Sequence, residues 1–143
     1  MPPPVTELSG AAGPDDFPEP AIRTTYQYCA RCHASPEVSP PNFLYGDAKK
    51  VRANLARCAE RIFYRLDVWS LPPAQRPKTP MPPVHALAGL GVAAETWPEA
   101  SALALLRQYS AGLVRAETGK EPRLADLEAR GYENLRRCLA TTR

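Results

Sequence analysis

The sequence predicts an all-α protein. Apolar side chains recur every three or four residues over long segments, no alternating apolar and polar run of strand length occurs, and prolines gather between the periodic segments. The chain has 143 residues, of which 44% are hydrophobic, and this suits one globular domain with appendages. No apolar run approaches the length of a membrane span.

Residues 1–20 differ in composition from the rest of the chain. They hold six of the 17 prolines and four acidic residues, and they contain no lysine or arginine. We therefore expect a flexible, acidic lead-in or tether. Its first residues have neither the basic start nor the apolar segment of a signal peptide. We expect the chain to be a mature form or an excised domain, from which a signal peptide or anchor is absent.

Two helices are predicted in the first half of the chain. The first covers roughly residues 21–32, directly after Pro20. The second begins near Asp47, a plausible N-cap, and reaches about residue 69. Its apolar residues step by three or four along one face: Val51, Leu55, Cys58, Ile62, Leu66 and Trp69.

The second half begins with a proline-rich loop and continues with two more predicted helices. Six of the 13 residues in 71–83 are proline, a density that excludes a helix or a central strand. Thr96 and Glu99 have the spacing of a capping box, which predicts a helix from there to about Val114. Residues 121–139 show a further amphipathic pattern and predict a C-terminal helix.

The motif Cys29-Ala30-Arg31-Cys32-His33 carries the chemistry. Two thiols separated by two residues can form thioethers to the two vinyl groups of one porphyrin, and the histidine that follows can bind the iron. This is the attachment pattern of a c-type haem. The pattern also occurs in zinc sites, in which Cys29 and Cys32 would combine with His33, Cys58 or His85, although that spacing is irregular.

Two other segments, together with this motif, resemble the class I (mitochondrial-type) cytochrome c family. They are Pro-Pro-Asn-Phe-Leu-Tyr-Gly at 40–46 and Lys-Thr-Pro-Met-Pro-Pro at 78–83. The resemblance covers roughly residues 21–115 and is to bacterial members with a single haem. It implies a cytochrome c fold, with about three core helices wrapped round one covalently bound haem c. Residues 116–143 would then be a C-terminal helical extension packed on this domain.

The resemblance also implies the residues of the site. Cys29 and Cys32 match the thioether cysteines, His33 matches the proximal iron ligand, and Met81 matches the methionine ligand of the proline-rich loop. The metal ligands are therefore His33 and Met81. A thioether opposite an imidazole favours Fe(II) and raises the reduction potential relative to two histidines.

The resemblance assigns a further role to the carbonyl group of Pro41. It is expected to accept a hydrogen bond from Nδ1 of His33, which would fix the tautomer of the imidazole and strengthen it as a ligand. Pro40 is the alternative acceptor. His85 competes with Met81 as the sixth iron ligand.

The two remaining cysteines, Cys58 and Cys138, both lie on apolar stripes of the predicted helices. In an oxidising compartment they are predicted to form a disulfide that clamps the C-terminal helix onto the middle helix. The alternative is two buried free thiols that act as small hydrophobic side chains.

These features predict an electron carrier and not an enzyme, because both axial positions of the iron would be filled. We expect it to shuttle electrons between periplasmic or otherwise extracytoplasmic redox partners, either alone or as a domain of a larger or membrane-anchored protein. Residues 21–115 carry 12 Lys/Arg against six Asp/Glu, so an acidic partner could dock on a basic surface. No motif suggests nucleic-acid binding. The alternative is a haem-based sensor or peroxidase-like domain in which Met81 leaves the iron.

Overall fold

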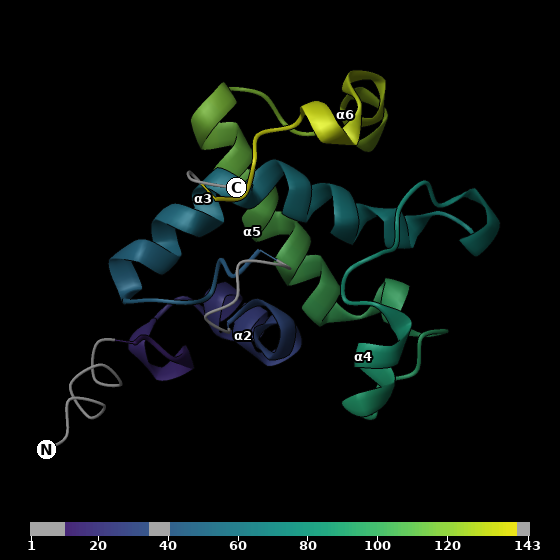
Figure 1. The fold of residues 1–143 in the computed structure, drawn as a ribbon. Coiled ribbons are helices and arrows are strands. Elements are labelled where there is room, and N and C mark those ends of the chain that lie inside the picture. Colours follow the sequence, from purple (N-terminus) through teal and green to yellow (C-terminus); the bar gives the residue numbers. More distant parts are fainter. Residues whose placement is uncertain (1–10, 35–40, 140–143) are drawn as a thin grey trace, which may run out of the picture.

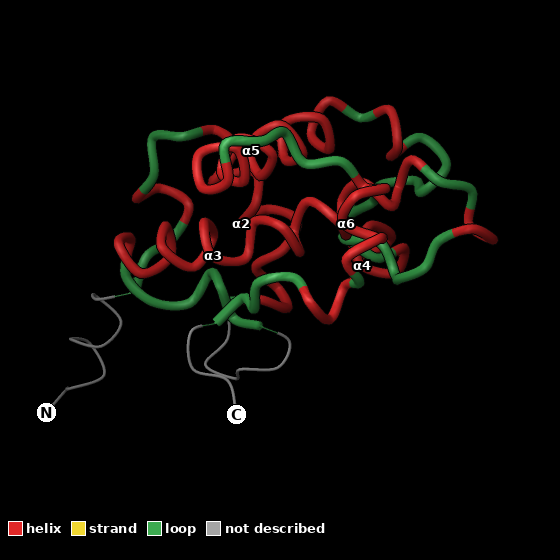
Figure 2. The backbone as a smooth tube through the Cα atoms, turned by 90° about the horizontal axis from the view of Figure 1, so that it is seen from above, coloured by secondary structure: helices red, strands yellow, loops and turns green. Residues whose placement is uncertain are grey.

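A computed structural model of the chain describes residues 11–34 and 41–139. These residues form helices and loops, with no strand among them (Figure 2), so the all-α prediction is confirmed. The α-helices of this part of the chain are α2 (Pro20–His33), α3 (Ala48–Asp67), α4 (Val84–Gly89), α5 (Ser101–Thr118) and α6 (Leu124–Arg130). Single 3₁₀ turns lie between several of them.

The centre of the molecule is the crossing of α3 and α5, which Figure 1 shows in the middle of the fold. The helix α2 packs on α5. The predicted apolar face of α3 is buried, with Val51, Leu55 and Leu66 each no more than 2% exposed. Burying a side chain of this size contributes about 1.5–3 kcal/mol, so this stripe accounts for much of the association between α3 and its neighbours.

The start of α3 follows the prediction. One carboxylate oxygen of Asp47 accepts a hydrogen bond from the backbone N–H of Lys50 at 2.8 Å. This satisfies one of the four N–H groups that a helix leaves unpaired at its first turn.

Replacing Asp47 with alanine is expected to lower the free energy of unfolding by about 1 kcal/mol, because the first turn of α3 loses its acceptor. Asp47→Asn keeps a side-chain oxygen at the same place and is expected to retain most of the stability. Chemical denaturation of the three proteins measures the difference. Equal losses in both variants would contradict the capping role.

Residues 11–20 are better packed than a flexible lead-in would be. Phe17 is 1% exposed and belongs to the core cluster around Ile22 and Leu55. Glu19 forms an ion pair with Arg52 at 2.8 Å. Although this segment is rich in proline and acidic residues, it contains one large apolar side chain, Phe17. Burial of Phe17 in the core holds the segment against the rest of the fold. Residues 1–10 lie outside the described part.

The capping box predicted at Thr96 is wrong. The hydroxyl of Thr96 donates to the carbonyl of Ala93 at 3.3 Å, residues 97–99 form a 3₁₀ turn, and α5 begins only at Ser101. The reason lies in Trp97, which is 1% exposed and packs its ring 4.9 Å from that of Tyr28. Burial of this indole fixes the backbone conformation of residues 97–99, and α5 begins only after them.

The predicted C-terminal helix over residues 121–139 is wrong in its second half. The helix α6 ends at Arg130, and Gly131 follows with φ +89°. Residues other than glycine rarely adopt this backbone conformation. A 3₁₀ turn at Tyr132–Asn134 and an extended segment then carry the chain to Cys138. Cys138 therefore does not lie on a helix.

Candidate functional site

A cavity of about 430 Å³ brings the predicted site residues together. Its walls come from α2, α3, α4, the proline-rich loop (residues 71–83) and the part of the chain from α6 onward, residues 124–139, which we call the C-terminal segment. All five residues predicted to bind the cofactor line it, together with the other two cysteines: Cys29, Cys32, His33, Pro41, Met81, Cys58 and Cys138. The volume lies within the range of about 300–1,000 Å³ that is typical of ligand sites.

The imidazole of His33 is held from two sides. Its Nδ1 lies 2.6 Å from the carbonyl oxygen of Pro41, which is the hydrogen bond expected from the sequence. Because a carbonyl oxygen can only accept a hydrogen bond, Nδ1 carries the proton. Nε2 therefore keeps its lone pair, with which it can bind a metal ion. Phe43 stacks on the ring at 4.4 Å. Burial lowers the pKa of His33, the hydrogen bond to Pro41 partly offsets this, and nearby Arg65 lowers the pKa again. Pro40, the alternative acceptor, lies outside the described residues.

The two motif cysteines lie in the last turns of α2, directly before His33. A spacing of three residues places them on one side of the helix, and both are free thiols. Cys29 is half-buried, whereas Cys32 is exposed. Burial raises the pKa of Cys29 to about 12, so this sulfur is a neutral thiol at physiological pH.

The loop that carries Met81 is hydrogen-bonded on both sides of the methionine to α3 and to the 3₁₀ turn Val68–Ser70 that follows it. The backbone N–H of Met81 donates to the carbonyl of Arg65 at 3.0 Å, and the Arg65 guanidinium donates to the carbonyl of Thr79 at 2.9 Å. The indole N–H of the buried Trp69 donates to the carbonyl of Pro82 at 3.1 Å. These bonds hold the thioether at the cavity wall.

The other residues that could bind iron or zinc, His85 and Cys58, also line the cavity. His85 lines the same cavity and is exposed, so the structure brings both sixth-ligand alternatives to one place. Cys58 is not available to zinc, because it is oxidised to a disulfide. In the described ranges, no three His, Cys, Asp or Glu side chains converge in a way that could hold a metal ion.

Sequence reasoning missed the positive charge of this cavity. Arg31, Arg61 and Arg65 line it, and no Asp or Glu does so within the described chain. The Nε atoms of Arg61 and Arg65 are buried and have no hydrogen-bond partner. The two arginines lie one turn apart on α3, so their common position is visible in the sequence, but an exposed helix face would give the same spacing.

The cavity is closed on one side by the C-terminal segment. Cys58 and Cys138 form the predicted disulfide, so the alternative of two free thiols is wrong. Tyr132, another residue that the sequence analysis did not assign to the site, also lines the cavity. Residues from the last part of the chain therefore form part of the wall.

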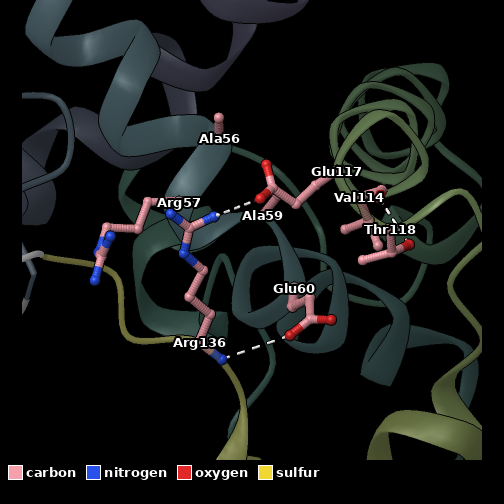
Figure 3. A pocket seen from close by; sticks show the side chains of 8 residues that line it. All are labelled: Ala56, Arg57, Ala59, Glu60, Val114, Glu117, Thr118 and Arg136. Carbon is pink, nitrogen blue, oxygen red and sulfur yellow. Dashed lines mark hydrogen bonds and ion pairs between the residues drawn. The ribbon is translucent and has the colours of Figure 1, made fainter.

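A second cavity of about 160 Å³ lies between α3, α5 and the C-terminal segment (Figure 3). Three of its four charged side chains form ion pairs or hydrogen bonds, whereas the buried Nε of Arg57 has no hydrogen-bond partner. Arg136 forms an ion pair with Glu117 at 3.3 Å, and its backbone N–H lies 3.5 Å from Glu60. Glu60 also accepts two hydrogen bonds from Arg130, at 2.8 and 3.2 Å. This is an ion-paired joint that holds the C-terminal segment on the two central helices.

Within the described residues, no helix combines the length and apolar character that crossing a membrane requires. The chain matches no protein-family model, and no curated protein or solved structure is significantly similar to it.

Proposed function

We propose that this chain carries a single covalently attached haem c and transfers electrons between redox partners. One observation carries the proposal: Cys29, Cys32, His33, Pro41 and Met81 all line one cavity, and His33 is hydrogen-bonded to Pro41 as a haem-ligating histidine requires. A structural role for these residues would not bring two free thiols, an oriented imidazole and a fastened thioether to the same space.

The residues present fit a haem. Cys29 and Cys32 would form the thioethers, and His33 and Met81 would bind the iron. The surroundings of Ile62, Leu66 and Phe43 are apolar and suit a porphyrin ring. A haem also bears two carboxylates. The buried, unpartnered Nε atoms of Arg61 and Arg65 at a cavity wall without acidic residues are suited to such anions.

When bound, the haem supplies a one-electron redox couple, and the chain holds the ligands in place around it. Pro41 keeps Nδ1 of His33 protonated, so that Nε2 would be available to the iron as a neutral donor. The bonds from Arg65 and Trp69 to the proline-rich loop limit the movement of Met81. A site whose ligands move little on a change of charge is suited to electron transfer rather than to substrate turnover.

The disulfide and the exposed residues at the cavity suggest where the protein works and what it meets. A structural disulfide persists in oxidising compartments, which supports an extracytoplasmic, for example periplasmic, location. Arg31, Cys32 and His85 are exposed at the cavity. Electrons would pass at this edge, and the positive charge there favours an acidic redox partner.

The first test is production of the chain in a host that attaches haem outside the cytoplasm. The purified protein is expected to show the sharp α band of low-spin haem c in its reduced-minus-oxidised spectrum, and the haem is expected to stay with the protein in acid-acetone. Cys29→Ala combined with Cys32→Ala should release all haem to the solvent. Extractable haem in the unmodified protein, or none, would defeat the proposal.

The sensor or peroxidase-like alternative requires that Met81 leaves the iron. The three hydrogen bonds that hold the loop on α3 and on the 3₁₀ turn after it favour the six-coordinate electron carrier over this alternative. Mixing the reduced protein with carbon monoxide at neutral pH separates the two functions. Slow or absent binding is expected of the electron carrier, and rapid binding would favour the alternative.

A further inference from the structure

Three cations surround the aromatic ring of Tyr132. The guanidinium carbons of Arg61 and Arg65 lie 4.9 and 4.8 Å from the ring centroid, and Nζ of Lys78 lies 5.1 Å from it. Cations at this distance from an aromatic ring are attracted by its quadrupole. One side chain of the C-terminal segment thus gathers positive charge from α3 and from the proline-rich loop.

The cation cluster (Arg61, Arg65 and Lys78) is only weakly paired with negative charge. The carboxylate of Glu128, on α6, accepts a hydrogen bond from the hydroxyl of Tyr64, whose ring packs edge-on against that of Tyr132 at 4.9 Å. Among the described residues, neither arginine forms an ion pair with a carboxylate, and Lys78 meets only the exposed Glu133, at 3.2 Å. Like charges held close together repel one another, and the repulsion is strongest where water is excluded. The cluster is therefore arranged for an anion that arrives with a ligand.

We propose that Tyr132 is a positioning residue, which holds Arg61 and Arg65 at the cavity wall, with Lys78 beside them, so that these cations meet the carboxylates of the bound haem and raise its reduction potential. The inference rests on the proposed function, because a haem c is the source of the carboxylates. Cations beside the haem favour the reduced iron, which carries one positive charge fewer. They also keep the carboxylates ionised, because an adjacent cation lowers the pKa of an acid.

The C-terminal segment is anchored independently of the tyrosine ring. The disulfide joins it to α3 at Cys58, and Arg130 pairs with Glu60 at 2.8 Å. Arg61 itself donates to the carbonyl of Leu135 at 3.1 Å. A substitution of Tyr132 should therefore remove the ring from the cation cluster without releasing the segment from the fold.

The test compares the midpoint potential of the haem-loaded protein with that of Tyr132→Leu and Tyr132→Phe over a series of pH values. Tyr132→Leu is expected to have a lower potential, which falls more steeply as pH rises, because its less well-paired carboxylates take up protons on reduction. Tyr132→Phe keeps the ring and is expected to restore most of the potential. Tyr45→Leu, an exposed tyrosine away from the cavity, is the matched control.

Two further variants make the test specific. Tyr132→Leu should shift the potential less in an Arg61→Gln background than in the unmodified protein, because the two residues act through one contact. Lys78→Met removes the one cation of the cluster that does not line the cavity, and it should lower the potential by a smaller amount. If Tyr132→Leu fails to fold, the potential of Lys78→Met still shows whether the cation cluster acts on the haem.

The outcomes separate this inference from the proposed function. Absence of covalent haem in the unmodified chain contradicts the proposed function. Fully loaded Tyr132→Leu and Lys78→Met proteins with unchanged potentials and unchanged pH dependence overturn the role of Tyr132 and leave the proposed function standing. Equal shifts in Tyr132→Leu and Tyr132→Phe would also overturn it, because the ring would then not be what acts.

Discussion

Replacing Cys58 and Cys138 together with alanine is expected to lower the free energy of unfolding by about 4–5 kcal/mol. The disulfide joins positions 80 residues apart, and in the chain-entropy model a closed loop of this length restricts the unfolded chain by about that amount. Alanine is the appropriate substitute because Cys58 is 1% exposed, and a serine hydroxyl there would add the cost of an unpaired polar group. Denaturation by guanidinium chloride measures the change.

Reduction of the unmodified protein provides the control. Thioethers to haem resist thiol reductants, so a reductant should open only the Cys58–Cys138 bond and should reproduce most of the loss. The alanine variant should no longer respond to reductant. A loss below about 1 kcal/mol in both experiments would mean that the C-terminal segment is held by its ion pairs, chiefly Arg130 with Glu60, and that the disulfide adds little.

Replacing Met81 with alanine is expected to remove the low-spin spectrum of the reduced haem protein at neutral pH and to let carbon monoxide bind rapidly. The reason is that the thioether would be lost while the loop stays in place through the bond from the backbone N–H of Met81 to Arg65 and the indole bond from Trp69 to Pro82. Met81→His should restore a six-coordinate spectrum at a lower potential, because a second imidazole does not favour Fe(II) as a thioether does. Absorption spectra and potentiometric titration measure both effects.

His85→Ala is the matched variant for this experiment, since His85 also lines the cavity. If Met81 is the ligand, His85→Ala keeps the low-spin spectrum and the slow reaction with carbon monoxide. The opposite pattern, in which His85→Ala opens the iron and Met81→Ala does not, would assign the sixth position to the histidine. The two substitutions therefore decide between the ligands that the sequence left open.

The parts of the fold that the sequence predicts well depend on short-range rules. The N-cap at Asp47 and the apolar stripe of α3 need only neighbouring residues to be recognised. The capping box at Thr96 failed because burial of Trp97 against Tyr28, a contact between distant segments, decides the backbone there. Gly131 is a local signal for the end of α6, but the apolar stripe continues past it, and this stripe predicts one longer helix.

The same division holds for the site. The cysteine motif, Pro41 and Met81 are visible because their spacing along the chain is characteristic. The spacing of Arg61 and Arg65 does not distinguish a cavity wall from an exposed helix face, and Tyr132 becomes their neighbour only when the C-terminal segment folds back onto α3. Their role follows from shared walls, unpartnered Nε atoms and cation–ring distances, which no local pattern encodes.

All four cysteines of the chain border one cavity, and this has a consequence for how the protein matures. If haem c is attached as proposed, two of these sulfurs must stay reduced until that step, whereas the other two must be oxidised. A Cys29–Cys58 or Cys32–Cys138 bond would use up one sulfur of each kind. Under the proposed function, the order in which the sulfurs react would therefore decide whether a newly made chain takes up haem or becomes a misbridged, haem-free product.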